Sequence, residues 1–224
     1  MKTADQRQEA AEGLSEIYKR HHEGSSGPRR YGFAIAEEQR AVWLRLRVGT
    51  GRDILDLGCR DGTLTRHFAL QNRVVGIDID VEALAAARNR LGLSVIAADL
   101  NRWALPLGSG SFDVVIAGEV LEHVQFPEML VSEARRVLRP GGVFLGSVPN
   151  AFRLRNRLLF LRGRQFETDP THLHWYSRHG LRALLGAHFT GIELGYAGGR
   201  RAWLSGALFA ESLLWMCRPA MERE

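Results

Sequence analysis

The stretch Asp53-Ile54-Leu55-Asp56-Leu57-Gly58-Cys59-Arg60-Asp61-Gly62-Thr63-Leu64-Thr65 decides the fold of this 224-residue chain. A short apolar run ends at a carboxylate, two glycines follow four residues apart, and a helix-like segment spans 64–70. This order predicts a strand, a tight turn and a helix. Glycine lets a backbone approach a ligand closely, and the start of a helix presents unpaired N–H groups to an anion. The stretch is therefore typical of a loop that binds a nucleotide cofactor.

The spacing of the glycines argues against a dinucleotide. A dinucleotide loop has the form G-x-G-x-x-G and holds a pyrophosphate at the start of the helix, whereas Gly58 and Gly62 enclose three other residues. The carboxylates of Asp56 and Asp61 would repel a diphosphate, but they suit a ligand that carries an ammonium or sulfonium charge. We therefore expect a cofactor with a positively charged centre.

At this loop the chain resembles the class I S-adenosylmethionine-dependent methyltransferases, whose first motif has the form D-x-G-C-G-x-G. It is similar to the small-molecule type, as in methyltransferase domains of ubiquinone and methionine biosynthesis. Arg60 stands where the middle glycine is usual, so Arg60 either points outward or pairs with the methionine carboxylate of the cofactor. The resemblance implies S-adenosyl-L-methionine as cofactor and a Rossmann-like, doubly wound α/β sheet of seven strands, mostly parallel with an antiparallel last strand.

Two further predicted strands end beside acidic residues. The run 73–80 contains Asp78, which lies twenty residues after Gly58, the spacing at which a strand-end acid reaches ribose hydroxyls. The run 93–100 ends in Asp99 and Leu100. By resemblance, the Asp99 carboxylate accepts a hydrogen bond from the adenine amino group and the Leu100 backbone N–H reaches the ring. Ligands bind at the carboxyl ends of strands in such sheets, so these termini predict one crevice.

A fourth predicted strand, 112–117, leads into Gly118-Glu119-Val120-Leu121-Glu122-His123-Val124, which resembles the E-V-L-E-H-V stretch of small-molecule members. On a helical turn Glu119 and His123 would share one face. A histidine beside a carboxylate can act as a base or can fix a loop over the cofactor, and both roles stay open for His123. The predicted cofactor-binding residues are Asp56, Gly58, Cys59, Arg60, Gly62, Asp78, Ile79, Asp99, Leu100, Gly118 and Glu119.

The remaining predicted elements complete the alternation of strands and helices. Apolar spacing predicts helices over 34–48, 81–91 and 127–139, with Asp80 as the N-cap of the second. Residues 138–142 predict a turn before a fifth strand at 143–148, and 191–196 and 208–217 predict the last two strands. Five β units between residues 52 and 150 are typical of a parallel, doubly wound sheet.

The predicted domain organisation is a flexible or helical N-terminal lid at 1–33 and a methyltransferase domain at 34–224, with an acceptor-recognition insert at about 150–176. Five arginines alternate with apolar residues between Arg153 and Arg164. As a helix, this segment would contact a membrane surface or an anionic or lipid-like substrate, or it would form a solvated lid whose arginine stems cover the pocket.

The segment after this insert contains His172, His174 and Tyr176. By resemblance these residues border the acceptor pocket, where one of them, or His123, would take the proton of a hydroxyl. His172 and His174 form a weak metal pattern because Asp169 is the only third ligand nearby, so we expect no metal. Ser177 predicts the N-cap of a helix that reaches residue 185.

Composition limits the function classes. The content of 45% hydrophobic and 25% charged residues is ordinary for one globular domain. A net charge of +5 is compatible with a nucleic acid, an anionic membrane surface or an acidic substrate as partner, but the arginines are spread along the chain, which favours a generally arginine-rich composition. The first residues lack the apolar core of a signal peptide and no apolar run is long enough to span a membrane, so we expect a cytoplasmic protein. The two cysteines form no C-x-x-C pattern.

The combined patterns predict transfer of a methyl group from S-adenosylmethionine to a small-molecule acceptor, at a hydroxyl of a quinone-like, glycan or lipid-linked substrate. A methyltransferase of RNA or another nucleic acid is the first alternative. It is disfavoured because the fourth strand is not followed by the Asn/Asp-Pro-Pro-aromatic loop used on base amino groups. A cofactor-binding protein without activity is the second alternative, and a nicotinamide oxidoreductase is the least favoured.

Overall fold

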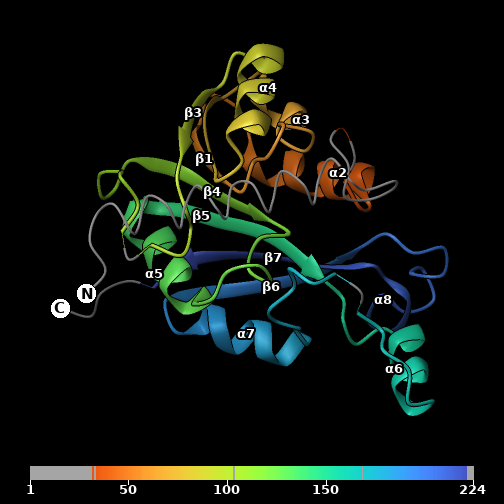
Figure 1. The fold of residues 1–224 in the computed structure, drawn as a ribbon. Coiled ribbons are helices and arrows are strands. Elements are labelled where there is room, and N and C mark those ends of the chain that lie inside the picture. Colours follow the sequence, from red (N-terminus) through yellow and green to blue (C-terminus); the bar gives the residue numbers. More distant parts are fainter. Residues whose placement is uncertain (1–31, 33, 103, 168, 221–224) are drawn as a thin grey trace, which may run out of the picture.

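The computed structural model of this chain describes residues 32, 34–102, 104–167 and 169–220. It contains one seven-stranded sheet in the order β3-β2-β1-β4-β5-β7-β6 (Figure 1). The first five strands pair in parallel, and β7 runs antiparallel between β5 and β6, which confirms the predicted fold class. The strands are β1 (Asp53–Leu57), β2 (Arg73–Asp78), β3 (Ser94–Ala97), β4 (Phe112–Gly118), β5 (Leu138–Pro149), β6 (Phe189–Ala197) and β7 (Ser212–Pro219).

Helices cover both faces of the sheet (Figure 1). On one face Leu44 and Val48 of α2 and Phe68 of α3 pack against Ile54 and Ile116, and α5 and α7 contribute their apolar sides to the other face. None of the described helices is both long and apolar enough to cross a membrane. The helices are α2 (Glu37–Val48), α3 (Arg66–Ala69), α4 (Val81–Leu91), α5 (Pro127–Val137), α6 (Leu154–Leu161), α7 (Arg178–Gly186) and α8 (Gly206–Phe209).

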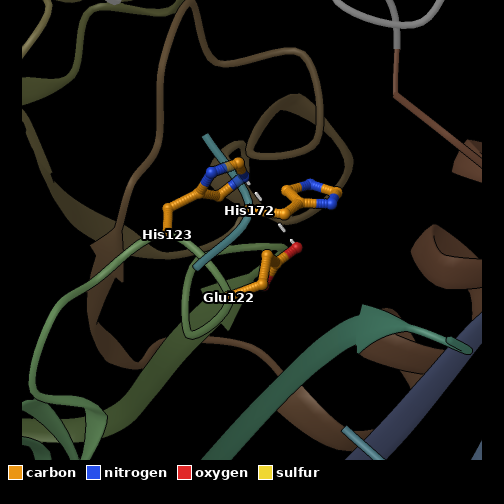
Figure 2. A group of neighbouring side chains, drawn as sticks. All are labelled: Glu122, His123 and His172. Carbon is orange, nitrogen blue, oxygen red and sulfur yellow. Dashed lines mark ion pairs between the residues drawn. The ribbon is translucent and has the colours of Figure 1, made fainter. Parts of the chain in front are cut away.

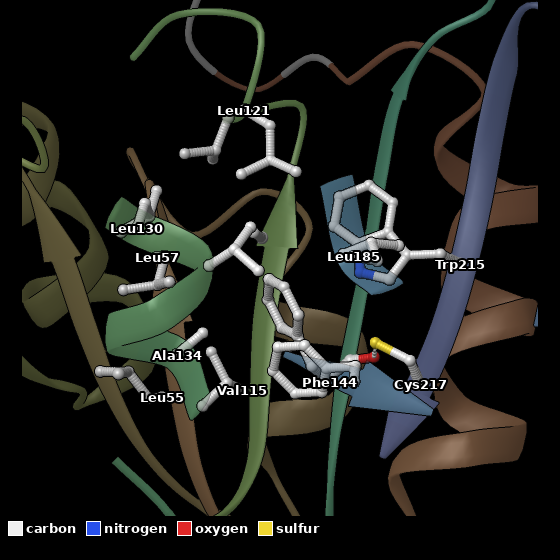
Figure 3. Packing of buried hydrophobic residues seen from close by; sticks show 14 of the residues in the cluster. Leu55, Leu57, Val115, Leu121, Leu130, Ala134, Phe144, Leu185, Trp215 and Cys217 are labelled. Atoms are coloured by element: carbon white, nitrogen blue, oxygen red, sulfur yellow. Dashed lines mark hydrogen bonds between the residues drawn. The ribbon is translucent and has the colours of Figure 1, made fainter. Parts of the chain in front are cut away.

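Trp215 of β7 anchors the antiparallel strand to the rest of the sheet (Figure 3). Its side chain is fully buried, and its ring meets Phe144 edge to face with centroids 5.7 Å apart. The indole lies against Gly146, where a Cβ would approach the ring to 2.1 Å. Burial of each large apolar side chain stabilises the fold by about 1.5–3 kcal/mol. This contact therefore holds β7 and β6 beside β5.

Both predicted N-caps are confirmed. The Asp80 side chain accepts a hydrogen bond from the Ala83 N–H at 3.0 Å at the start of α4, and Ser177 accepts one from the Gly180 N–H at 3.0 Å at the start of α7. A side-chain acceptor at this position satisfies a backbone donor that has no partner within its helix. These two caps fix the points at which the chain leaves β2 and enters α7.

Several predicted boundaries are wrong. Helix α2 begins at Glu37 and not at residue 34, because Ala36 takes a left-handed conformation with φ +50°. Helix α3 begins only at Arg66, since the preceding residues form turns around the glycine loop. The predicted N-terminal lid at 1–33 lies outside the described residues apart from Gly32.

The second half of the chain shows two further differences. Residues 138–142 are the first part of β5 and not a separate turn: Leu138 pairs with Phe112, and the register shifts before Val114 pairs with Val143. The last predicted strand starts too early, because Gly206–Phe209 forms the short helix α8 and β7 begins at Ser212.

Candidate active site

A cavity of about 870 Å³ lies at the carboxyl ends of the central strands. Gly58 after β1, Asp78 at the end of β2 and Gly118 at the end of β4 line it. Open α/β sheets bind their ligands at this edge, so the predicted crevice is present in the structure. The predicted cofactor-binding residues that line the cavity are Gly58, Cys59, Arg60, Asp78, Ile79, Asp99, Leu100, Gly118 and Glu119. The other two, Asp56 and Gly62, are not among the residues that line it.

Gly58 lets the loop after β1 approach the loop after β4. It has φ +67°, and its N–H donates to the Ile77 carbonyl oxygen at 2.8 Å. A Cβ at this position would lie 2.5 Å from Cγ2 of Val120. Only glycine combines this backbone conformation with this separation. Gly62 allows a close approach to a different element. A Cβ at Gly62 would lie 2.6 Å from the Leu91 side chain of α4.

Backbone strain concentrates around the cavity. Within the described part of the chain, the non-glycine residues with positive φ are Ala36 at 50°, Arg60 at 49° and Glu119 at 62°, and all of them line the cavity. Such conformations cost on the order of 1–3 kcal/mol each and cluster at functional sites. The strain therefore marks the same site as the glycine loop.

The Asp78 carboxylate organises the loop after β1. Its two oxygens accept hydrogen bonds from the Arg60 N–H at 2.8 Å and from the Asp80 N–H at 2.9 Å. The Arg60 side chain is held at the cavity wall by Asp61, with Nε 3.4 Å from Oδ1 and 20% of the side chain exposed. A contact between Arg60 and a cofactor carboxylate therefore stays a prediction.

Asp56 and Asp61 have structural partners in the protein. Asp61 accepts a hydrogen bond from Thr63 Oγ1 at 2.8 Å and pairs with Arg90 at 3.2 Å. Asp56 accepts one from Thr65 Oγ1 at 2.6 Å, and burial raises its pKa to about 7. Both carboxylates hold the glycine loop in place, and this explains their positions better than a direct contact with a cation does.

The loop after β4 differs from the predicted helical turn. Glu119 has a left-handed backbone, and its N–H donates to the Ser147 carbonyl oxygen at 2.8 Å, so the predicted helical pairing of Glu119 with His123 is wrong. The loop directs Glu122 inward, where 1% of the residue is exposed. Its two carboxylate oxygens have no partner at full hydrogen-bond geometry among the described residues, and they lie close to the Glu122 backbone N–H and the Glu119 side chain. Burial, with a further contribution from Glu119, raises the pKa of Glu122 well above its usual range.

Glu122, His123 and His172 meet at one wall of the cavity and form the Glu122–His123–His172 cluster (Figure 2). Nε2 of His123 lies 4.0 Å from Oε1 of Glu122, and the two imidazole rings pack edge to face with centroids 4.7 Å apart. Nδ1 of His172 lies 2.8 Å from Oε2 of Glu167. The fold therefore brings together proton-accepting groups from two distant parts of the sequence.

His174 and Tyr176, the other predicted catalytic residues, are not among the residues that line the cavity. The Tyr176 hydroxyl is buried, donates to the Leu121 carbonyl oxygen at 3.2 Å and has a pKa raised by burial. The backbone N–H groups of Leu173 and His174 donate to the Glu122 carbonyl oxygen at 2.7 and 3.2 Å. The segment 173–176 therefore packs on the loop after β4, and this contact brings His172 close to Glu122 and His123.

Arg40 of α2 is a cavity residue that the sequence patterns did not predict. It is 3% exposed, and its positive charge favours the ionised forms of Asp56 and Glu122 against the effect of burial on their pKa values. A signal exists in the sequence, because Arg40 lies on the same helical face as Leu44 and Val48, which are buried. A charged residue on an apolar face indicates a buried partner.

The other end of the cavity is formed by residues that follow β5. Helix α6 is present as predicted, and Phe160 and Leu161 on it are 72% and 79% exposed. The lining residues of this region are Asn150, Ala151, Arg153, Arg155, Asn156, Phe166, Glu167, Asp169, Thr171, His172 and Leu173. All of them belong to the predicted insert at 150–176, whose role in acceptor recognition stays a prediction.

Comparison with known proteins shows which proteins the chain is similar to. Residues 55–146 match a family model described as a methyltransferase domain. The chain is also similar to S-adenosylmethionine-dependent methyltransferases. A Mycolicibacterium smegmatis protein named "Probable S-adenosylmethionine-dependent methyltransferase" is 39% identical over 136 residues, which are 60% of this chain and 50% of that protein. The ubiquinone biosynthesis O-methyltransferase of Pseudomonas aeruginosa is 35% identical over 116 residues, 49% of this chain and 50% of that enzyme. The chain thus spans about half the length of these relatives.

Solved structures share the fold. The 1,6-didemethyltoxoflavin-N1-methyltransferase of Burkholderia thailandensis has a TM-score of 0.67 at 20% identity, over 99% of the present chain and 92% of that enzyme. The N-methyltransferase NodS of Bradyrhizobium japonicum has a TM-score of 0.65 at 18% identity, over 92% of this chain and 98% of its own. Both structures contain S-adenosylhomocysteine. At these identities the likeness concerns the fold.

Proposed function

We propose that this protein binds S-adenosyl-L-methionine and methylates a hydroxyl of a small-molecule acceptor of the quinone-like, glycan or lipid-linked class. The observation that carries this proposal is that one cavity joins the glycine loop to the Glu122–His123–His172 cluster. A hydroxyl must lose its proton when it is methylated, so a site for this reaction needs proton acceptors beside the methyl donor. The cavity combines these two requirements.

The cofactor end of the cavity fits the expected ligand. Gly58 and Gly118 form walls without side chains, and a Cβ at Gly118 would lie 2.8 Å from Nη2 of Arg40. Asp78 would accept hydrogen bonds from ribose hydroxyls, while Asp99 and the Leu100 backbone would contact adenine. When bound, S-adenosylmethionine supplies an electrophilic methyl group on a sulfonium, and the acceptor oxygen displaces a neutral thioether.

The acceptor end supplies orientation and a proton acceptor. Glu122, His123 and His172 can each take the hydroxyl proton directly or through water. The carboxylate of Glu122, 4.0 Å from Nε2 of His123, would stabilise an imidazolium. Alignment of the reacting atoms with water excluded is the larger part of catalysis for a transfer of this kind. We assign that task to the walls formed by residues 150–173.

The arginines and apolar side chains of the cavity wall formed by residues 150–173 favour an acceptor with an apolar or anionic portion. Arg153, Arg155 and Phe166 line the cavity, and α6 exposes Phe160 and Leu161 next to this end. Arginines beside exposed apolar side chains are typical of surfaces that contact anionic lipids. The similarity to a ubiquinone biosynthesis O-methyltransferase further supports a quinone-like acceptor.

An acceptor panel tests the proposed reaction. The purified protein is incubated with S-adenosylmethionine and isoprenoid catechols, glycans, lipid-linked glycans or RNA oligonucleotides, and products are analysed by mass spectrometry for one added methyl group. We expect methylation of a hydroxyl, strongly reduced in Glu122→Gln and unchanged in Glu128→Gln, an exposed glutamate on α5. Methylation of RNA alone would favour the nucleic-acid alternative. Cofactor binding without transfer to any acceptor would favour the non-catalytic alternative.

Vesicle binding tests the proposed lipid contact through α6. The protein is sedimented with anionic phosphatidylglycerol vesicles and with neutral phosphatidylcholine vesicles. We expect binding to the anionic vesicles that is reduced in Phe160→Ser and retained in Leu70→Ser, since Leu70 is 97% exposed but follows α3. Equal binding of both variants, or no binding of the wild type, would contradict a contact at α6.

A further inference from the structure

The Glu122–His123–His172 cluster has the composition of a metal site. One potential ligand atom of each residue lies within 4.8 Å of the others (Figure 2). One carboxylate and two imidazoles form a ligand set that binds zinc and other first-row divalent metals. We propose that this cluster binds one divalent first-row metal ion at the acceptor end of the cavity.

The hydrogen bonds of the two histidines set the tautomers that a metal requires. Nδ1 of His123 lies 3.1 Å from the Thr171 carbonyl oxygen, which can only accept, so Nδ1 carries the proton. Nδ1 of His172 lies 2.8 Å from Oε2 of Glu167, and a carboxylate there likewise places the proton on Nδ1. In both rings the lone pair is therefore on Nε2. Metal-bound histidines show the same pattern, with the second nitrogen donating to a carbonyl or carboxylate oxygen.

The carboxylate of Glu122 provides an independent sign of a cation. It is 1% exposed, and neither of its oxygens has a partner at full hydrogen-bond geometry among the described residues. Buried carboxylates are strongly disfavoured unless they are hydrogen-bonded, paired or bound to a metal. A divalent cation bound by the cluster would compensate the charge of Glu122.

The separation of the ligand atoms is close to the required value. Two ligands of one metal ion, each about 2.1 Å from it, lie about 3.4 Å apart in a tetrahedral site. Nε2 of His123 and Oε1 of Glu122 are 4.0 Å apart, and the whole set lies within 4.8 Å. Side-chain movements of about 1 Å would complete the site, and water or the acceptor would occupy the remaining position.

A metal ion here would activate the acceptor. A hydroxyl bound to a divalent ion is more acidic, so its proton can leave to solvent. The oxygen then forms its bond to the methyl carbon as the carbon–sulfur bond breaks and sulfur keeps the electron pair. With a metal ion bound, the histidines would act as ligands; without it, they keep the proton-accepting role given to them in the proposed function. This role rests on the proposed function, whereas metal binding itself does not.

Cobalt titration tests the site directly. The full chain is dialysed against EDTA, and Co²⁺ binding is followed by visible absorption in the wild type, Glu122→Gln and His172→Ala. The matched controls are Glu128→Gln and His179→Ala, both at exposed positions outside the cluster. We expect one bound Co²⁺ in the wild type and the controls. Affinity should fall by roughly 10-fold or more in the two cluster variants, because even loss of an outer partner of a metal ligand costs about 10–100-fold.

Two outcomes would overturn the proposal: no spectral change in the wild type, or equal affinity in the cluster variants and the controls. Circular dichroism verifies that each variant is folded. If Glu122→Gln does not fold, the cobalt affinity of His172→Ala alone tests the site, because His172 is partly exposed and its replacement is easier for the fold to accommodate. Calorimetry with S-adenosylhomocysteine is run on the same samples. Cobalt binding without cofactor binding would contradict the proposed function, and cofactor binding without cobalt binding would contradict the metal site alone.

Discussion

The close approach of two loops at Gly58 gives the sharpest test of the cofactor site. An alanine at this position would have to adopt φ +67° and would place its Cβ 2.5 Å from Cγ2 of Val120. The left-handed conformation costs an alanine about 1–2 kcal/mol. Val120 is buried and has a stiff side chain, so its displacement adds about 1–3 kcal/mol. We expect Gly58→Ala to lower the free energy of unfolding by about 2–5 kcal/mol.

Gly92→Ala is the matched control. Gly92 has φ +68° at the end of α4, and a Cβ there would meet no atom within 4 Å. The two variants therefore share the backbone strain and differ in the contact with Val120. Urea denaturation should show a loss of about 1–2 kcal/mol for Gly92→Ala. Titration with S-adenosylhomocysteine should show unchanged affinity for Gly92→Ala and, for Gly58→Ala, affinity weaker by about tenfold, or roughly 1.4 kcal/mol.

The two glycine variants would refute this reasoning if their unfolding free energies and cofactor affinities were the same. That result would mean that the loops after β1 and β4 separate at no cost. Weakened cofactor binding in Gly92→Ala alone would place the cofactor elsewhere.

Three further predictions concern strain, protonation and capping. Arg60→Gly removes a left-handed arginine, so urea denaturation should show unchanged stability or a gain of up to about 1 kcal/mol, and a clear loss would contradict strain at this residue. The pKa of Asp56 is raised by burial from 3.8 to about 7, so between these values the folded state holds a proton that the unfolded state has lost. The free energy of unfolding should therefore fall as pH rises from about 4 to 7, by up to about 1.4 kcal/mol per pH unit. Denaturation measured at several pH values should show a smaller slope in Asp56→Asn, and an unchanged slope would exclude Asp56 as its source. Ser177→Ala removes the N-cap of α7 and should cost about 1 kcal/mol in thermal unfolding, whereas no change would show that the bond to the Gly180 N–H contributes nothing.

Local patterns predicted the parts of the fold that depend on neighbouring residues. The apolar run and glycines of residues 53–65 produced β1 and its loop, and Asp80 and Ser177 capped the expected helices. These features depend on backbone chemistry within a few residues, which the sequence displays directly. The prediction of a seven-stranded sheet with an antiparallel last strand followed from the resemblance to a family and not from the residues alone.

The details of the site depend on contacts between distant residues and were harder to predict. Glu119 adopts a left-handed conformation, which no local signal for a glutamate indicates, and this turns Glu122 toward the cavity. His172 was compared with its neighbour His174, while its actual partners lie about fifty residues earlier. Arg40 lies on a helix that apolar spacing predicted, but its place in the cavity was not predicted. Long-range packing decides such placements.

Calorimetric titration with S-adenosylmethionine, S-adenosylhomocysteine and NAD tests the central claim most directly. The wild type is compared with Asp78→Ala and with Glu38→Ala, an exposed control on α2 outside the cavity. We predict one-to-one binding of the first two ligands with micromolar affinity, no binding of NAD, loss of binding in Asp78→Ala and retention in Glu38→Ala. Absence of binding to the wild type, or binding of NAD with equal affinity, would contradict the assignment of this cavity to S-adenosylmethionine.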